Sequence, residues 1–188
     1  MLYKVLNEDG KCYHGGKGKW SLPIRNADGS WTPGEWMPAV EGKLKLCANG
    51  YHGCRDEQVL QWLGPAIYEM EGRGDHLDGN DKSAYREARL PRRMNWDRNV
   101  AVAWACDCAE RVLPIFEAQF PDDRRPRQAI EMARHGDKAA AYTAARAAAY
   151  AAADVAAYAA AYAAADAAAY AAERRWQYER FCEYLIKG

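Results

Sequence analysis

Short apolar runs separated by turn residues dominate the first half of the chain. Asn-Glu-Asp-Gly at 7–10 predicts a turn that pairs the run before it with KCYHG at 11–15 in a β-hairpin. Asp56 and Gly64-Pro65 bound a predicted short helix, EQVLQWL. The main strand candidates are LYKVL at 2–6, KLKLC at 43–47, AIYEME at 66–71 and SAYREARL at 83–90. This pattern predicts a small mixed sheet with short helices.

After Asp97 the apolar positions recur at helical spacing. Pro114 is expected to end or kink the first of these helices. Asp122 and Asp123 are suited to cap a second helix, which Gly136 is expected to end. The apolar face of the first helix is expected to consist of Val100, Trp104, Cys108 and Val112. The expected anchors of the last helix, at 174–186, are Trp176, Phe181, Tyr184 and Leu185.

Composition changes sharply near residue 97. Residues 1–96 hold 13 of the 15 glycines, whereas the rest of the chain is rich in alanine and tyrosine. We therefore expect two domains: an α+β domain at 1–96 and an all-α, Ala/Tyr-rich region at 97–188. The predicted fold class of the whole chain is α+β.

The segment 139–172 holds 24 alanines in 34 residues. Residues 149–160 (AYAAADVAAYAA) and 161–172 (AYAAADAAAYAA) are two copies of one dodecapeptide. Twelve residues make about 3.3 helical turns, so equivalent tyrosines on one straight helix are offset by about 120° per repeat. Several short helices that restart near Asp154 and Asp166 are therefore favoured over one long helix, which stays open as the alternative.

Charge and hydropathy narrow the classes of partner. The 26 basic and 26 acidic residues cancel, which indicates no general attraction to nucleic acid or to an anionic membrane. No apolar run predicts a membrane span, and the first residues lack the apolar core of a signal peptide. A cytoplasmic location is therefore expected, in which the six cysteines are free thiols.

Two segments resemble known families. Residues 44–71, LKLCANGYHGCRDEQVLQWLGPAIYEME, together with Asp81-Lys82, resemble a domain of unknown function from phage and actinobacterial genomes with a CxxGYHxC-type motif. Residues 108–135, CAERVLPIFEAQFPDDRRPRQAIEMARH, and the alanine tract after them resemble the Ala-rich helical immunity protein family. These resemblances imply a mobile-element or conflict-system setting and no known reaction.

Cysteine and histidine cluster in the first 54 residues. Thiolate and imidazole are good zinc ligands, but Cys-x6-Cys is not a standard zinc-knuckle spacing and a fourth ligand is not evident. The alternative is that Cys47 and Cys54 are small buried residues at strand ends. No metal site is assigned; the candidate ligands are Cys12, His14, Cys47, His52 and Cys54.

An enzyme reading is also open, although no catalytic residue is assigned. Tyr-His-Gly-Gly at 13–16, Gly-Tyr-His at 50–52 and Tyr-Glu-Met-Glu at 68–71 follow an order similar to that of ADP-ribosyltransferases. That resemblance implies NAD as cofactor and His14, His52 and Glu71 as catalytic residues. The alternative is Gly-rich turns with polar surface residues. Nucleophilic catalysis by Cys12 or Cys54 has no evident orienting acid.

Binding to another protein is the function that the sequence favours. Arg92-Arg93 and the Arg124-Arg125-x-Arg127 cluster are expected to pair with acids rather than with nucleic acid. We therefore expect an inhibitor of a host defence system or an immunity-like protein, with an ADP-ribosyltransferase-like enzyme and an oligomerising structural protein as alternatives. The expected binding residues are Trp20, Trp31, Trp36, Tyr142, Tyr150, Tyr158, Tyr162 and Tyr170.

Overall fold

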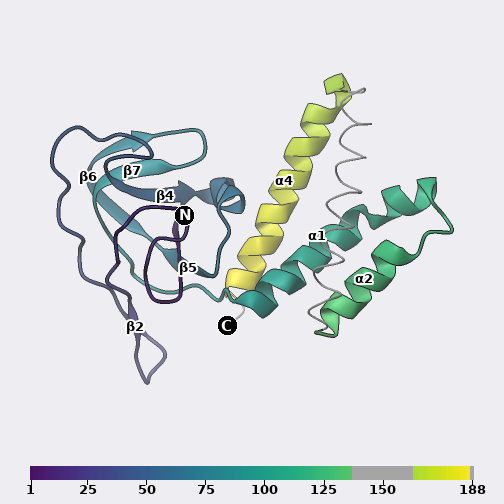
Figure 1. Cartoon of the computed structure of the whole chain (residues 1–188), viewed down its shortest axis with the longest axis horizontal. Coiled ribbons are helices and arrows are strands. Elements are labelled where there is room, and N and C mark those ends of the chain that lie inside the picture. Colours follow the sequence, from purple (N-terminus) through teal and green to yellow (C-terminus); the bar gives the residue numbers. More distant parts are fainter. Residues whose placement is uncertain (137–162, 187–188) are drawn as a thin grey trace. The chain divides into compact units, whose positions relative to one another are not determined.

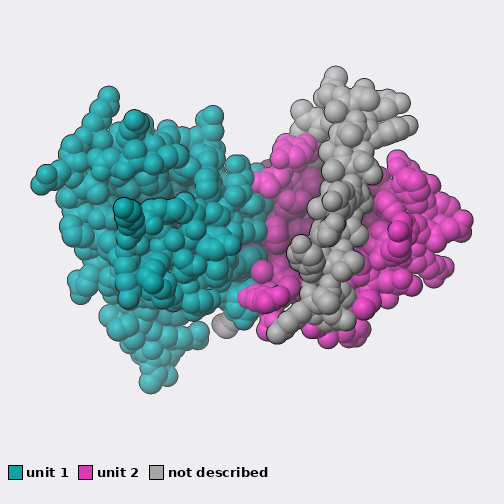
Figure 2. Space-filling view, viewed as in Figure 1, with its two compact units in different colours: residues 1–97, 182–188 teal, residues 98–181 magenta. Residues whose placement is uncertain are grey.

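A computed structural model describes residues 1–136 and 163–186 and divides the chain into two units (Figure 2). Unit 1 comprises Met1–Asp97 together with Cys182–Gly188, and unit 2 comprises Arg98–Phe181. The boundary after Asp97 falls where the composition changes. The last residues of the chain, however, belong to the unit that the first residues build.

Unit 1 contains a five-stranded sheet with the strand order β5-β1-β4-β7-β6 (Figure 1). Its strands are β1 (Leu2–Leu6), β4 (Tyr51–Arg55), β5 (Ala66–Glu69), β6 (Glu71–Asp78) and β7 (Ser83–Arg89). All of these strand pairs are antiparallel, so the expected mixed sheet is wrong in this respect. The residues between β6 and β7 form a short turn of the kind that joins antiparallel strands, and one short 3₁₀ helix, η1 (Asp56–Gln61), lies between β4 and β5.

Three of the predicted strands are confirmed, and two are wrong. Residues 11–15 form no strand; after the turn at 7–10, Cys12 makes a single antiparallel bridge to Leu6, and the pairing does not continue along β1, whose Leu2 and Tyr3 pair with β4. Residues 43–47 form no strand, because the chain turns at 45–49, where a bridge joins Lys45 and Asn49. The predicted helix after Asp56 is present as η1, and β4 was not predicted.

Two further segments complete the sheet region. Strands β2 (Ile24–Arg25) and β3 (Trp31–Thr32) form a separate two-stranded hairpin. Residues 34–40 then run beside the second half of β7, where the Gly34, Met37 and Val40 amides donate to carbonyl oxygens of residues 86–90. The segment therefore extends pairing along β7 beyond the end of β4.

The core of unit 1 is built on β1, β5 and β7. Apolar residues at adjacent positions of β5 are all buried, as expected for a strand covered on both faces. One buried cluster consists of Leu6, Trp20, Ala66, Tyr68, Met70, Ala88 and Leu90. The end of the last helix adds Leu185, and Asn95 donates its backbone N–H to the Leu185 oxygen at 3.3 Å and its side-chain amide to the Tyr184 oxygen at 3.0 Å.

Unit 2 is built from α1 (Arg98–Gln119), α2 (Arg125–Arg134) and the first part of α4 (Ala163–Ile186). Figure 1 shows α1 and α2 as a helical hairpin. Cys106 and Leu113 of α1 pack with Ile130 and Ala133 of α2. Among residues 98–136 and 163–186 the structure describes three helices after the sheet, so the α+β class is confirmed. The finer all-α description of 97–188 does not hold as predicted, because residues from Cys182 belong to unit 1 and 137–162 lie outside the described residues.

Ion pairs reinforce the helical packing of unit 2. Asp107 of α1 accepts hydrogen bonds from Arg134 of α2 and from Arg180 of α4, both at 2.6 Å. Arg111 of α1 donates to Glu173 of α4 at 2.7 Å. Asp107 is largely buried, and charge-assisted hydrogen bonds in such places are stronger than exposed ones. Asp107 therefore joins all three helices.

The helix boundaries differ from the prediction at two positions. Pro114 lies inside α1, which continues to Gln119, so the expected helix end at Pro114 is wrong and the alternative of a kink stays a prediction; buried Leu113 holds this part of α1 in the helical core. The backbone of α4 is helical from Ala163 through Asp166, so the predicted helix restart at Asp166 is wrong. Asp154, the other predicted restart, lies outside the described residues. Of the predicted anchors, Phe181 and Leu185 are buried.

Because β5 is buried in the core, replacing an isoleucine of β5 should destabilise unit 1 far more than replacing an exposed isoleucine elsewhere. Ile67 in β5 is 0% exposed, whereas Ile24 in β2 is 66% exposed. Ile67→Ala should destabilise unit 1 by about 3 kcal/mol, because it leaves a cavity. Hydrogen exchange of β1 peptides, followed by mass spectrometry, should then be roughly 100-fold faster. Ile24→Ala is the matched control and should change exchange little; equal effects of the two variants would contradict this description of the core.

Candidate functional site

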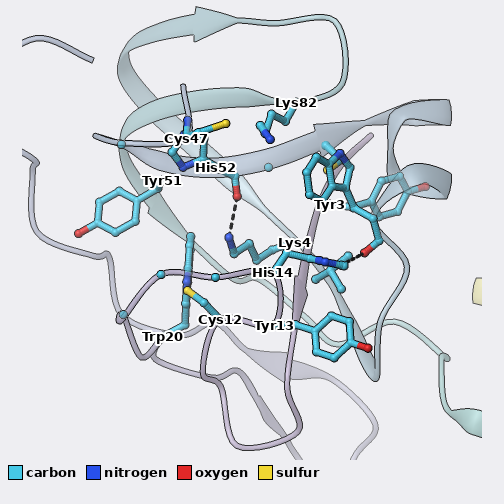
Figure 3. Close-up of a pocket in the computed structure, with 18 of the residues that line it drawn as sticks. Tyr3, Lys4, Cys12, Tyr13, His14, Trp20, Cys47, Tyr51, His52 and Lys82 are labelled. Carbon is cyan, nitrogen blue, oxygen red and sulfur yellow. Dashed lines mark hydrogen bonds between the residues drawn. The ribbon is translucent and has the colours of Figure 1, made fainter. Parts of the chain in front are cut away.

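A cavity of about 550 Å³ opens in unit 1 beside β1 and β4 (Figure 3). Its walls come from β1, from the loop at 12–18 and from residues 47–54, with single side chains added by Trp20, Met37, Trp62 and Lys82. All of these residues lie within unit 1. The cavity is therefore formed by segments that are distant in sequence.

The loop at 12–18 is shaped by its glycines. Gly15 and Gly16 have φ values of 83° and 89°, which favour glycine because a side chain is strained there. The Cys12 amide donates to the Gly18 oxygen at 3.3 Å and closes the loop. Two glycines thus give the cavity a wall of backbone.

Two lysines bring positive charge to the cavity. Lys4 Nζ donates to the His52 carbonyl oxygen at 2.9 Å and lies 4.9 Å from the centre of the Trp20 ring. Burial lowers the pKa of Lys4, and the Cys12 and Cys54 thiols act in the opposite direction. Lys4 lies at the centre of an apolar strand. A lysine in that position is unusual, and this was the feature of the sequence from which Lys4 could have been identified as a candidate site residue.

Lys82 occupies a comparable place above a second tryptophan. Its Nζ lies 3.9 Å from the centre of the Trp62 ring and 3.4 Å from an Asp81 carboxylate oxygen. Burial alone would lower the pKa of Lys82, but hydrogen bonding to Cys47 and the charge of Asp81 raise it above its ordinary value. Lys82 therefore stays cationic at neutral pH.

His52 is held as a neutral hydrogen-bond acceptor. Its Nε2 accepts the Cys47 backbone N–H at 2.9 Å. Burial lowers the pKa of His52, and the charges of Lys4 and Lys82 lower it further. Cys47 has a φ of 62°, which is uncommon for a residue other than glycine, and this hydrogen bond helps to hold that backbone conformation.

His14 is fixed at the other side of the cavity. Its Nε2 forms a 2.7 Å hydrogen bond with the Trp62 carbonyl oxygen, which requires a proton on Nε2. The ring lies edge-on to Tyr13 and to Trp62, with centroids 4.6 and 5.2 Å away.

The structure brings all five candidate zinc ligands to the walls of this cavity. Within residues 1–136 and 163–186, however, no three His, Cys, Asp or Glu side chains are placed to hold a metal ion. The physical reason is visible at the two histidines, because each Nε2 is already used by a backbone group.

The three residues of the enzyme alternative are only partly brought together. His14 and His52 line the cavity, whereas Glu71 does not. Glu71 begins β6 and forms an ion pair with Arg89 at 2.6 Å. Among the described residues that line the cavity there is no Asp or Glu, so this site does not include the carboxylate that the alternative needs.

The predicted binding residues have different surroundings. Trp20 is buried in the core of unit 1. Trp31 lies beneath Arg25, and Trp36 lies beneath Arg73 and Arg89. Tyr170 is exposed on α4. The remaining predicted residues lie outside the described part of the chain: Tyr142, Tyr150, Tyr158 and Tyr162.

The basic clusters pair with acids as predicted. Arg92 contacts Glu69 and Arg93 contacts Glu8, at 2.6 and 2.7 Å. In the second cluster, Arg125 pairs with Asp123 at 2.6 Å, and Arg127 pairs with Glu117 at 2.7 Å. These ion pairs explain the clusters without nucleic acid.

The fold and the cavity define an α+β protein with a cation- and aromatic-lined pocket in its first unit. Residues 94–184 match the model of the family described as "Imm-5 like putative immunity protein". The match confirms the immunity-like resemblance of the C-terminal half and covers all of unit 2. It leaves residues 44–71 outside, so their resemblance stays a prediction. No curated protein matches the chain, and no solved structure does.

One further finding bears on the setting of the protein. None of the helices among the described residues combines the length and the apolar character needed to cross a membrane.

The different burial of the cysteines predicts that they react with iodoacetamide at very different rates. Burial raises the pKa of Cys54 to about 11 and that of Cys108 to about 12, whereas Cys47 is exposed. At pH 8 about one Cys54 thiol in a thousand is the reactive thiolate. Iodoacetamide labelling, read by peptide mass spectrometry, should modify Cys47 long before Cys54 or Cys108. In about 8 M urea all three cysteines should be labelled at roughly the same rate. Equal native rates would contradict this description of the thiols.

Proposed function

We propose that this protein acts by binding another protein, in the manner of an immunity-like inhibitor, and that unit 2 carries the interface. The observation that carries the proposal is the match of residues 94–184 to the immunity-like family, because it spans unit 2. The partner that we propose is a component of a host defence system, and the setting is a phage or another mobile element in the host cytoplasm. The resemblances of residues 44–71 and 108–135 support this setting.

Exposed apolar side chains on α1 support an interface in unit 2. Val112 and Ile115 are exposed, and Phe116 follows on the same helical face. The Phe116 ring packs against that of Phe120, with centroids 5.0 Å apart, and Phe120 is itself exposed. Large apolar and aromatic side chains at a surface are typical of protein-binding sites.

The opposite face of α1 gives this surface a rigid support. Cys106 and Leu113 are buried against α2, and Asp107 joins α1 to Arg134 and Arg180. A surface that is ordered before binding loses less conformational entropy on association. The interface that we propose is therefore presented by helices that the core and the ion pairs already hold in place.

Two matched isoleucines test the proposal. Ile115 on α1 is 56% exposed and Ile24 on β2 is 66% exposed, so a charge at either position should leave the fold intact. Ile115→Glu should reduce the amount of co-purified partner at least ~10-fold, because it places a charge in an apolar interface. Ile24→Glu should retain the partner at the level of the unchanged protein.

The measurement is affinity purification of the tagged full chain from host cells, followed by quantitative mass spectrometry. Thermal unfolding of both variants serves as the control for folding. The proposal fails if the unchanged protein captures no partner above background. Equal capture by both variants would instead place the interface outside this face of α1.

A further inference from the structure

We propose that the cavity of unit 1 binds a free nucleotide, with the lysines holding its phosphates and the aromatic side chains contacting its base. This is a small-molecule site in unit 1 and does not depend on the protein interface proposed for unit 2. Three observations carry the proposal: the charge of the lining, its aromatic content and its dimensions.

The lining is positively charged. Lys4, Lys17 and Lys82 contribute to the walls, and no Asp or Glu is among the described residues that line them. Asp81 pairs with Lys82 at 3.4 Å from outside the lining and offsets part of one charge. A cavity walled by one sign of charge concentrates ligands of the opposite sign. The ligand is therefore an anion.

The ammonium groups are positioned by packing rather than free in solvent. The Lys82 side chain is only 14% exposed, and its Nζ is held over the Trp62 ring. Lys4 Nζ is anchored by the His52 oxygen, which uses one of the three donors that an ammonium group carries. Figure 3 shows the Lys4 amine directed at the His52 carbonyl oxygen. Fixed ammonium groups of this kind suit phosphate oxygens.

The loop at 12–18 provides room for a phosphate close to the backbone. A Cβ atom at Gly15 would meet no atom within 4 Å, so this wall is open. Gly15 and Gly16 let backbone N–H groups approach a ligand that a side chain would keep away. Lys17 follows directly and adds charge at the same wall.

Aromatic side chains surround the same space. Tyr13, Trp20, Tyr51 and Trp62 all line the cavity. Tyr13 is the most exposed of the four, since 45% of its surface is accessible to solvent. The Tyr51 ring is held in place by a 2.8 Å hydrogen bond from its hydroxyl group to the Pro38 oxygen. Bases stack on accessible aromatic rings, and the exposed ring of Tyr13 is the one best placed for this contact. An anion that also carries an aromatic ring fits this lining better than phosphate alone.

The size of the cavity limits the ligand to a small molecule. Its volume of about 550 Å³ falls in the range of pockets that enclose single small ligands. One nucleotide satisfies the volume, the charge and the aromatic lining together.

Isothermal titration calorimetry of the full chain tests the proposal with ADP, GDP, CDP and UDP as probes. Adenosine and inorganic pyrophosphate serve as the two halves of a nucleotide. At least one diphosphate should bind about tenfold more tightly than either half. Its affinity should fall as sodium chloride is raised, because salt screens the lysines.

Lys82→Gln should weaken that binding by about tenfold, because it removes a charge-assisted contact. Lys17→Gln should weaken this binding as well. Because Lys17 is exposed, this second variant keeps the test valid if Lys82→Gln does not fold. Lys43→Gln is the control, since Lys43 is exposed and does not line the cavity. Thermal unfolding of Lys17→Gln and of Lys43→Gln should match that of the unchanged protein.

Four outcomes would overturn the proposal. They are no binding by any diphosphate, adenosine binding as tightly as the diphosphate, pyrophosphate binding as tightly as the diphosphate, and unchanged affinity in both Lys82→Gln and Lys17→Gln. None of these results bears on the capture of a protein partner by unit 2, so the two proposals fail separately.

Discussion

The position of β1 between β5 and β4 is the constraint on which unit 1 depends. β5 pairs with β1 on one side and β4 pairs with it on the other, so both edges of this strand are used. Tyr3, Val5 and Leu6 are buried as a result. The same geometry carries the side chain of Lys4 to the cavity, although it comes from the middle of an apolar strand. The core and the candidate site thus share one five-residue segment.

A lysine in such a place is stable only if its surroundings suit a cation. The His52 oxygen and the Trp20 ring face the Lys4 ammonium group, and burying an ammonium without such partners is costly. The Cys54 thiol beside Lys4 contributes no negative charge at neutral pH, because burial raises its pKa to about 11. No acidic side chain among the described residues that line the cavity neutralises its lysines. The arginines of the basic clusters, in contrast, form ion pairs with carboxylates.

The local pattern of apolar and turn residues was sufficient to predict those strands that do not depend on contacts with distant parts of the chain. The runs at 2–6, 66–71 and 83–90 are apolar and bounded by turn residues, and each contains a strand. The run at 11–15 pairs with β1 at one position only, between Cys12 and Leu6, and β4 takes the same edge of β1 at Leu2 and Tyr3, which only the topology reveals. β4 itself was missed because Gly53 interrupts it; the glycine is required there, since Met70 and Leu2 fill the space of a Cβ atom. The cysteines and histidines of the cavity were recognisable, but only the fold could reveal that backbone groups already use the histidine nitrogens.

The order of the two units along the chain has a consequence for biosynthesis. Unit 1 begins at Met1 but takes its last segment from Cys182 onward, after the whole of unit 2. Asn95 binds the Tyr184 and Leu185 oxygens, so the point where the chain leaves unit 1 is tied to the point where it returns. A ribosome must therefore translate all of unit 2 before unit 1 can close. Until then unit 1 lacks the buried side chain of Leu185.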